Sequence, residues 1–373
     1  MKYVLWLCLS YLLLISSCSS EDGMTVKKGN HIIPFELEVS TGRPDMRTRA
    51  DNNPLAPQEP GTCHVNRIKV FVFKAPGTVG SSPADMVKFI YETTGIVTDQ
   101  PDTSNGKYKA KGYFTAEAGV SYRVIALAYR DTDELYLNID DAFLLNNFVG
   151  KNYRDITISL KENNGMYEAP EFFKGILRDE SAITDVISGS DDLNLKGFLY
   201  RAIGRINIEI NHIPDNVTKL EFAVDRYSVE NYLYDNVGDM YIGFPLNGTT
   251  LAGERVLAST TGFSNDAAAK GRTARLTSDV LRLAPDDIGS IFYIKATRGE
   301  TTDTYIIMSA DQWIYTDYVG ILEKVISSNR FIVPTNYQLN VHGDFSALKA
   351  GNIMIEYSDE ITDEVKIGIL INK

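Results

Sequence analysis

The strongest constraint on the fold is a succession of short runs in which apolar and polar residues alternate. Beyond residue 60 these runs are rich in Val, Ile, Tyr, Phe and Thr, and Gly, Asn, Asp and Pro separate them. A period of two gives each face of an extended strand its own row of side chains. The pattern predicts an all-β fold with strands at 67–73, 107–116, 121–130, 155–160, 204–213, 219–227, 290–298, 304–310, 336–345, 352–358 and 365–373.

The number of strands predicts more than one domain. A single β-sandwich takes roughly 100 residues, and this chain has 373, of which 44% are hydrophobic and 23% charged, as in an ordinary globular protein. The polar segment 178–194 is the most plausible boundary between domains, so we expect two tandem β-sandwich domains at 50–195 and 196–373. Helical spacing at 82–95 and 133–150 predicts a few short helices in the connections.

The first residues have the pattern of an export signal. A lysine precedes an apolar run from Tyr3 to Ile15, and small residues lead to Cys18. The run is shorter than the roughly 20 residues that span a bilayer. Residues 15–18 resemble the lipobox of bacterial lipoproteins, which implies removal of residues 1–17 and attachment of lipid, such as palmitate, to Cys18. A plain secretory signal is the alternative. The segment 19–22, two serines followed by Glu21 and Asp22, resembles the surface-export signal of some Gram-negative lipoproteins.

Cysteine content and charge exclude two classes of protein. The chain contains Cys8, Cys18 and Cys63. If Cys18 is acylated and Cys8 leaves with the signal, no internal disulfide framework remains. The formal net charge of −12 and a pI near 4.9 argue against a nucleic-acid partner, because phosphate binding requires a basic face.

Residues 18–49 read as a propeptide with one strand. In the strand at 31–40, Ile33, Phe35, Leu37 and Val39 share a face, opposite Pro34, Glu36 and Glu38. Proline within a strand is tolerated mainly at a sheet edge, so we expect an edge strand whose glutamates face water. The proline-rich stretch 41–61 follows, with the composition of an exposed linker.

The C-terminal segment 365–373 repeats this apolar face. Val365, Ile367, Ile369 and Ile371 lie at a spacing of two. One strand could therefore replace the other in the same groove, and a sheet that loses a strand captures another by β-augmentation. A head-to-tail contact of this kind builds a fibre. Packing of the segment within its own domain is the alternative.

The sequence offers little for catalysis or metal binding. None of its histidines, His31, His64, His212 and His342, stands at metal-ligand spacing from another histidine or a cysteine. His64 adjoins Cys63, but neighbouring strand residues point to opposite faces, so a nucleophile–base pair is not expected. The acid pairs 191–192, 286–287 and 363–364 fit solvated turns better than a calcium site. We therefore expect no enzyme, no catalytic residue, no metal and no cofactor.

Aromatic residues supply one alternative function. Two groups could form a stacking platform for sugars: Tyr227, Tyr232 and Tyr234, and Trp313, Tyr315 and Tyr318. Such residues more often fill sandwich edges and loop bases. The platform would make this chain a monomeric, surface-tethered glycan-binding lipoprotein.

Taken together, these features resemble the fimbrillins, the subunits of type V pili. The resemblance is carried by the lipobox at Cys18, the strand at 31–40, the arginines that follow it, "NRIKVFVF" (66–73) and "GFLYRAIGRINIEI" (197–210). It implies two transthyretin-like β-sandwich domains and cleavage by an arginine-specific protease. The expected cut follows Arg49, with Arg47 as second choice, whereas Pro44 blocks a cut after Arg43.

The predicted function is that of an adhesive pilus subunit polymerised by donor-strand exchange. Its partners would be other pilus subunits, the protease, the outer membrane through the lipid, and a host or glycan ligand. Its location would be the outer-membrane surface, and the fimbrium after processing. Cleaved shaft, uncleaved anchor and tip subunits remain open alternatives.

Overall fold

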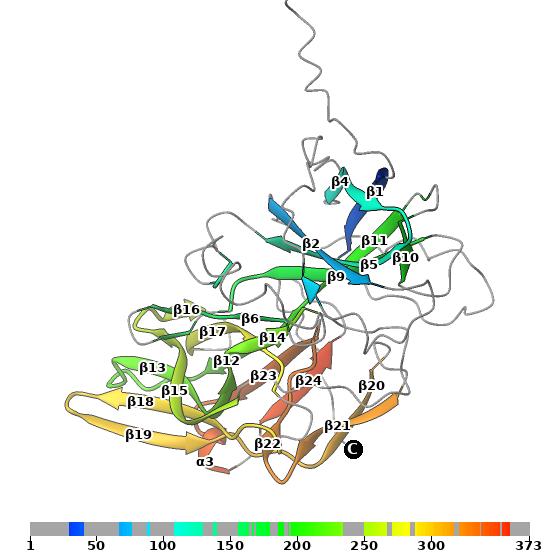
Figure 1. Ribbon diagram of the computed structural model, residues 1–373. Coiled ribbons are helices and arrows are strands. Elements are labelled where there is room, and N and C mark those ends of the chain that lie inside the picture. Colours follow the sequence, from blue (N-terminus) through cyan, green and yellow to red (C-terminus); the bar gives the residue numbers. More distant parts are fainter. Residues whose placement is uncertain are drawn as a thin grey trace, which may run out of the picture.

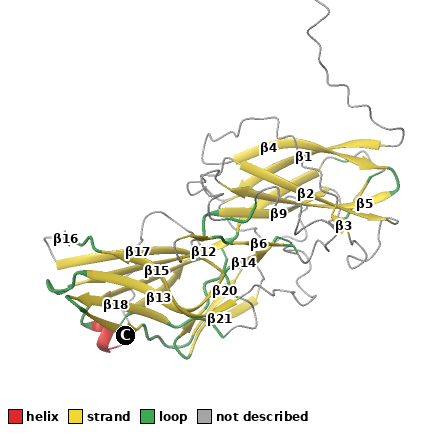
Figure 2. Ribbon diagram, turned by 60° about the vertical axis from the view of Figure 1, so that its left-hand side comes forward, coloured by secondary structure: helices red, strands yellow, loops and turns green. Residues whose placement is uncertain are grey.

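The computed structural model shows an almost entirely β protein, which confirms the predicted fold class. Figures 1 and 2 show two large curled sheets, one from each half of the chain. Among the described residues, helix occurs as the single turn α3 (Ala347–Ala350). The structure describes residues 30–40, 67–76, 88–89, 108–129, 137–139, 156–163, 166–167, 169–179, 186–189, 193, 195–233, 250–266, 271–283, 288–316, 321–335, 337–350 and 353–358.

The first sheet has eight strands in the order β3-β2-β5-β9-β11-β1-β4, with β10 paired to β5. Its pairs are antiparallel except for β1 and β11, which are parallel. The strands are β1 (Asn30–Ser40), β2 (Arg67–Pro76), β3 (Lys88–Phe89), β4 (Tyr108–Glu117), β5 (Val120–Tyr129), β9 (Phe172–Asp179), β10 (Ile187–Ser188) and β11 (Leu195–Arg201).

The second sheet has nine strands in the order β19-β18-β13-β17-β12-β23-β24, with β15 paired to β13 and β16 to β17. Figure 1 places it below the first sheet. Its strands are β12 (Ile203–Asn211), β13 (Lys219–Ser228), β15 (Thr250–Thr260), β16 (Ser264–Asp266), β17 (Gly271–Leu281), β18 (Phe292–Arg298), β19 (Thr301–Ile306), β23 (Gln338–Asp344) and β24 (Met354–Ser358).

Three small sheets complete the described architecture. They are β14-β6, β20-β21-β22 and β7-β8. The strands are β6 (Thr157–Ser159), β7 (Glu162–Asn163), β8 (Met166–Tyr167), β14 (Glu230–Tyr232), β20 (Gln312–Thr316), β21 (Ile321–Ser327) and β22 (Arg330–Phe331). The β14-β6 pair links a strand from each half of the chain.

The chain passes from the first sheet to the second at a single residue. Ala202 separates β11 from β12, and its N–H donates to the Phe172 carbonyl at 2.9 Å. The strand that follows the predicted boundary segment, at 195–201, therefore belongs to the first sheet. The division into domains at 195 and 196 stays a prediction.

Buried apolar residues form three clusters. One fills the concave second sheet, and a second lies on the face of the first sheet that carries Ile33, Phe35 and Leu37. The third lies on the opposite face and includes Ala202, Ile203 and Leu281 as well as first-sheet residues. Because both faces of the first sheet are covered, all but one residue of β5 is buried.

Both predicted helices are wrong where the structure describes them. Within 82–95, residues Lys88–Phe89 form β3 on the free edge of β2. Within 133–150, Leu137 forms an antiparallel bridge with Leu160, and the Asn138 N–H donates to the Ser159 carbonyl at 2.9 Å. In both places the backbone is bonded to a distant strand, which overrides local helical spacing. The other residues of these segments lie outside the described ranges.

Candidate strand-binding groove

Strand β1 lies inside the first sheet, hydrogen-bonded on both sides. It runs parallel to β11 from Phe35↔Leu195 to Ser40↔Tyr200 and antiparallel to β4 from Asn30↔Glu117 to Val39↔Tyr108. The prediction of an edge strand is therefore wrong. The β11 ladder begins one residue after Pro34, so the missing N–H of this proline precedes that ladder.

The apolar face of β1 is buried as the alternation predicts. The exposed fractions of Ile33, Phe35 and Leu37 are 1%, 2% and 0%. Full burial of three such side chains contributes on the order of 5–9 kcal/mol before ordering costs. The side chain of Val39 lies outside the described ones. Glu36 and Glu38, on the opposite face, are half-buried, so the expectation that they face open water is wrong as well.

A glycine of β11 gives Leu37 its space. Gly197 is the partner of Leu37 in the ladder, and a Cβ at Gly197 would fall 2.8 Å from Leu37 Cδ2 and 3.2 Å from Leu177 Cγ. Any larger residue at Gly197 would therefore push against the strand or its core. The groove is shaped for a branched apolar side chain at this point, and only the pairing of two distant segments reveals it.

Strand β1 is joined to the rest of the sheet by a long stretch of chain. The next described residue after Ser40 is Arg67, which begins β2, and β2 is not a neighbour of β1 in the sheet. The contacts of β1 are therefore made with strands far away in the sequence. If the chain were cut between residues 41 and 66, β1 would be held by non-covalent contacts alone.

Several predicted site residues lie outside the described ranges. They are the lipidation residue Cys18, the cleavage candidates Arg43, Arg47 and Arg49, and the apolar face Val365, Ile367, Ile369 and Ile371. Cys63, His64 and the three acid pairs also lie outside them. Their assigned roles stay predictions.

The described histidines have structural surroundings. His212 Nδ1 lies 2.7 Å from Asp344 Oδ1, His342 is buried in β23, and His31 is exposed at the start of β1. No group of three or more His, Cys, Asp or Glu among the described residues has the arrangement of a metal site.

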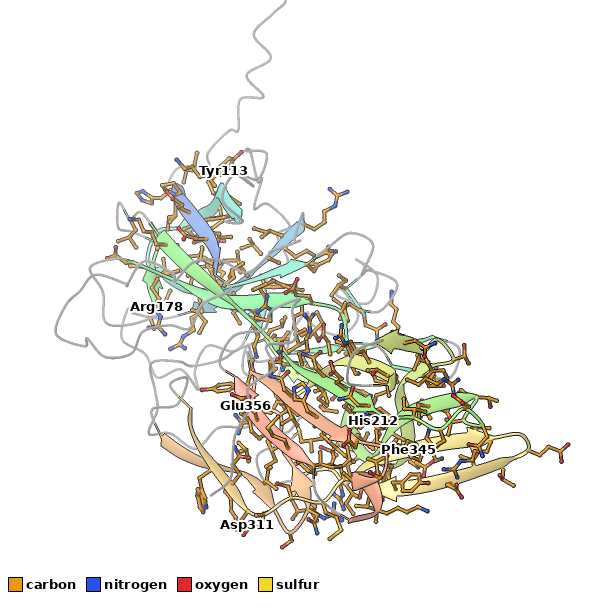
Figure 3. All side chains as sticks on the ribbon, turned by 180° about the vertical axis from the view of Figure 1, so that it is seen from behind. Tyr113, Arg178, His212, Asp311, Phe345 and Glu356 are labelled. Atoms are coloured by element: carbon orange, nitrogen blue, oxygen red, sulfur yellow. The ribbon has the colours of Figure 1, made fainter. Side chains whose placement is uncertain are left out.

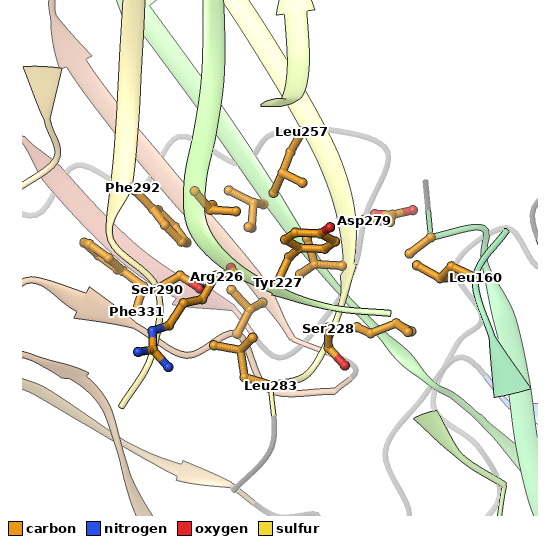
Figure 4. Close-up of a pocket in the computed structure, with 16 residues that line it drawn as sticks. Leu160, Arg226, Tyr227, Ser228, Leu257, Asp279, Leu283, Ser290, Phe292 and Phe331 are labelled. Carbon is orange, nitrogen blue, oxygen red and sulfur yellow. Dashed lines mark hydrogen bonds between the residues drawn. The ribbon is translucent and has the colours of Figure 1, made fainter. Parts of the chain in front are cut away.

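The second sheet contains a small cavity with an apolar lining. Its volume is about 30 Å³, room for one or two water molecules. Figure 4 shows Tyr227, Leu257, Leu283 and Phe292 around it. The hydroxyls at its wall are engaged, since Ser290 Oγ donates to the Arg226 carbonyl at 2.6 Å and Ser228 Oγ to the Glu230 carbonyl at 2.9 Å. No base activates either hydroxyl in these contacts.

The two aromatic groups have different surroundings. Tyr227 is buried, its hydroxyl accepts a hydrogen bond from Arg255 at 2.9 Å, and the Arg255 guanidinium lies 5.2 Å from its ring centre. It therefore cannot offer a face to a sugar. Trp313 on β20 is 55% exposed, and the Lys324 amine lies 5.6 Å from its ring centre. The side chains of Tyr234, Tyr315 and Tyr318 are not among the described ones.

Comparison with known proteins gives matches by structure alone. No family model and no curated protein matches the sequence. Similar solved structures include the fimbrial anchor protein Mfa2 from Porphyromonas gingivalis, with 12% identity, a TM-score of 0.41, and coverage of 87% of this chain and 98% of that chain.

Two further structures come from Bacteroides ovatus. A candidate adhesin has 12% identity and a TM-score of 0.38, with 78% of this chain and 87% of that chain covered. A candidate cell adhesion protein has 9% identity and a TM-score of 0.39, with 90% and 100% covered. Among the described residues, no helix is long and apolar enough to cross a membrane.

Proposed function

We propose that this chain is a structural subunit of a cell-surface fimbria that polymerises by exchange of β1 for the strand of another subunit. The observation that carries the proposal is the position of β1. It is bonded on both sides, its apolar face is buried, and it is separated in the sequence from every strand it touches. Its removal would leave two unpaired strand edges around an apolar slot, which is the arrangement that captures another strand.

The remaining steps of the proposal come from the sequence. Lipid on Cys18 would hold the precursor at the outer membrane, and an arginine-specific protease would cut after Arg49 or, as second choice, after Arg47. The cut would free the body of the protein from both its anchor and β1. The segment 365–373, with four apolar residues on one face, would serve as the donated strand. This role is structural and adhesive and requires no catalytic residue.

Limited digestion with an arginine-specific protease tests the proposal. We expect a new N-terminus at Ala50, followed by SDS-resistant ladders of the released body. Arg49→Ala should move the cut to Arg47, and the double change of both arginines should abolish it. Arg43→Ala is the matched control and should change nothing, because Pro44 follows Arg43.

Two outcomes would overturn the assembly step. One is a released body that never forms ladders at any concentration. The other is a chain without residues 365–373 that folds and still assembles, since it lacks the proposed donor. A lipid-bearing chain that resists the protease would instead be the uncleaved anchor subunit.

A glycan-binding lipoprotein is a second candidate because Trp313 is half-exposed on β20. Titration with oligosaccharides, followed by tryptophan fluorescence, tests it. Trp313→Ala should abolish binding under this hypothesis. Trp6 lies in the export signal, so it makes no contribution to the fluorescence of the mature protein if residues 1–17 are removed.

A further inference from the structure

A row of charged residues crosses the first sheet on the face opposite Ile33, Phe35 and Leu37. Glu36 of β1 pairs with Lys111 of β4 on one side and with Lys196 of β11 on the other. Lys196 pairs in turn with Arg178 of β9. Lys111 is exposed, and the other three residues are half-buried. Figure 3 shows Arg178 on the first sheet.

Glu36 is the single anion in this four-residue row. Residues directly opposite one another on neighbouring strands interact, opposite charges favourably and like charges unfavourably. With β1 in place, Glu36 separates the cation of β4 from the two cations of β11 and β9. With β1 gone, Lys111 and Lys196 border the groove at the same level, and Arg178 lies one strand behind Lys196. An incoming strand meets these charges at the position that Glu36 occupied.

We propose that the groove left by β1 selects a strand that alternates apolar and acidic residues, with an acidic side chain at the level of Glu36. This inference rests on the strand exchange proposed above and specifies its partner. The apolar positions provide most of the binding energy and are common to many strands. The charged row distinguishes among them. A register shift of one residue does not avoid it, because that shift turns the apolar face outward.

By this criterion the chain's own segment 365–373 fits the groove poorly. When its four apolar residues are aligned with Ile33, Phe35, Leu37 and Val39, Gly368 falls at the level of Glu36 and Leu370 at the level of Glu38. A shift of two residues brings Lys366 to the level of Glu36, between Lys111 and Lys196. The favoured occupant is therefore a strand of a different protein, which should displace the chain's own segment 365–373 from this groove wherever both are present.

Peptide exchange tests the partner chemistry directly. The full chain, with a protease site inserted between residues 41 and 66, is cut and mixed with fluorescent peptides, and anisotropy reports uptake. The peptide of residues 30–40 should bind most tightly. Glu36→Lys in that peptide exchanges two opposite-charge pairs for two like-charge pairs, so its dissociation constant should rise about tenfold or more, and Glu36→Gln should raise it about threefold. Both differences should shrink at 1 M salt.

The second part of the test looks for substitutions that raise the affinity of a peptide for the cut chain. The peptide of residues 364–373 should bind at least about tenfold more weakly than the peptide of residues 30–40. Gly368→Glu in the former should recover several-fold of that difference. A cut chain with Lys196→Glu should bind the Glu36→Lys peptide better than it binds the unchanged 30–40 peptide. Lys349→Glu, on the exposed face of α3, is the matched control and should leave the order of affinities unchanged.

The outcomes separate this inference from the proposed function. If the cut chain takes up no peptide, including that of residues 30–40, strand exchange at β1 itself fails. If it takes up all peptides within threefold of one another, exchange stands and the charge selection is overturned. Binding of the 364–373 peptide as tight as that of the 30–40 peptide at low salt would overturn the preference for a different protein's strand.

Discussion

At the scale of single residues, Leu37 shows most clearly how β1 packs into the first sheet. It is fully buried over Gly197, at a point where the neighbouring strand has no side chain. The alternation predicts that Leu37 faces a core. It does not reveal that the space for Leu37 is left by Gly197, a residue far away in the sequence.

We predict that Leu37→Ala destabilises the folded chain by about 2–5 kcal/mol, because it removes a buried side chain and leaves a cavity. The matched control is Ile32→Ala on the same strand, where the side chain is 46% exposed and the cost should stay under about 1 kcal/mol. Urea unfolding followed by circular dichroism measures both. Equal effects of the two changes would contradict the placement of β1 in the core.

Asp311 provides a prediction about pH. The hydrogen bond from Lys324 Nζ, at 2.6 Å, and then the Ser328 N–H, at 2.9 Å, lower the pKa of Asp311 below its ordinary value of 3.8. Figure 3 shows Asp311 at the margin of the second half. Because the folded pKa is depressed, the stabilising contribution is present above the unfolded pKa and is lost as pH falls through the folded pKa.

NMR titration of the Asp311 carboxyl measures this shift. We expect an apparent pKa below 3.8 in the unchanged chain and a rise toward 3.8 in Lys324→Met. Protection of the Ser328 amide against hydrogen exchange, relative to its intrinsic rate, should fall over the same range of pH. A carboxyl that titrates identically in both chains would show that the Lys324 contact does not persist in solution.

At the scale of elements, burial decides which strands the sequence reveals. The alternating runs predict β2, β4, β5, β12, β13, β18 and β23 well. Strand β9 escapes the prediction because Phe172 and Phe173 are buried on opposite faces, which removes the alternation, and its apolar run is shorter than the run 124–129 that marks the equally buried β5. Strand β15 escapes it for the opposite reason. Its residues are mostly exposed or half-buried, and pairing with β13 holds it in place.

Register in the second sheet depends on a buried polar row. Thr277 Oγ1 donates to Asn207 Oδ1 at 2.9 Å, Asn207 Nδ2 to Asn340 Oδ1 at 3.2 Å, and Gln338 Nε2 to the same oxygen at 2.9 Å. These bonds join β17, β12 and β23 across one level of the sheet. They work only in the observed register, so they favour it over a shifted one.

We predict that Asn207→Ala costs about 1–3 kcal/mol, because it removes one of the two donors to the buried Asn340 amide oxygen and the acceptor of the Thr277 hydroxyl. Thr302→Ala is the control. It breaks an exposed bond of 3.1 Å to Thr297 and should cost under about 0.5 kcal/mol. Equilibrium unfolding in urea compares the two. A cost for Asn207→Ala as small as the control would show that water replaces the lost bonds.

At the scale of the whole molecule, the two halves of the chain are joined by contacts as well as by the chain connection at Ala202. Lys174 of β9 is buried, and its Nζ donates to Asn231 Oδ1 at 2.6 Å and to the Tyr232 carbonyl on β14. The apolar cluster that contains Ala202, Ile203 and Leu281 surrounds the same junction. We expect these contacts to couple the two halves in unfolding.

We predict that Lys174→Met lowers the free energy of unfolding by about 1–3 kcal/mol, because two half-buried acceptors, Asn231 Oδ1 and the Tyr232 carbonyl, lose the donor that the buried Lys174 provides. It should also split one thermal transition into two, as the halves uncouple. Lys349→Met, on the exposed face of α3, should change neither quantity. Differential scanning calorimetry gives the number of transitions. A single unchanged transition in Lys174→Met would mean that the apolar cluster alone couples the halves.

The sequence by itself determined the strands β1, β2, β4, β5, β12, β13, β18 and β23 and the face of β1 that is buried. Both follow from a period of two, which is a local property of the chain. Only the tertiary structure decided that β1 lies between β4 and β11, that Leu37 meets Gly197, and that Glu36 stands among Lys111, Lys196 and Arg178. Backbone hydrogen bonds are the same for every sequence, so the choice of neighbour and register depends on side-chain packing between segments far apart in the chain.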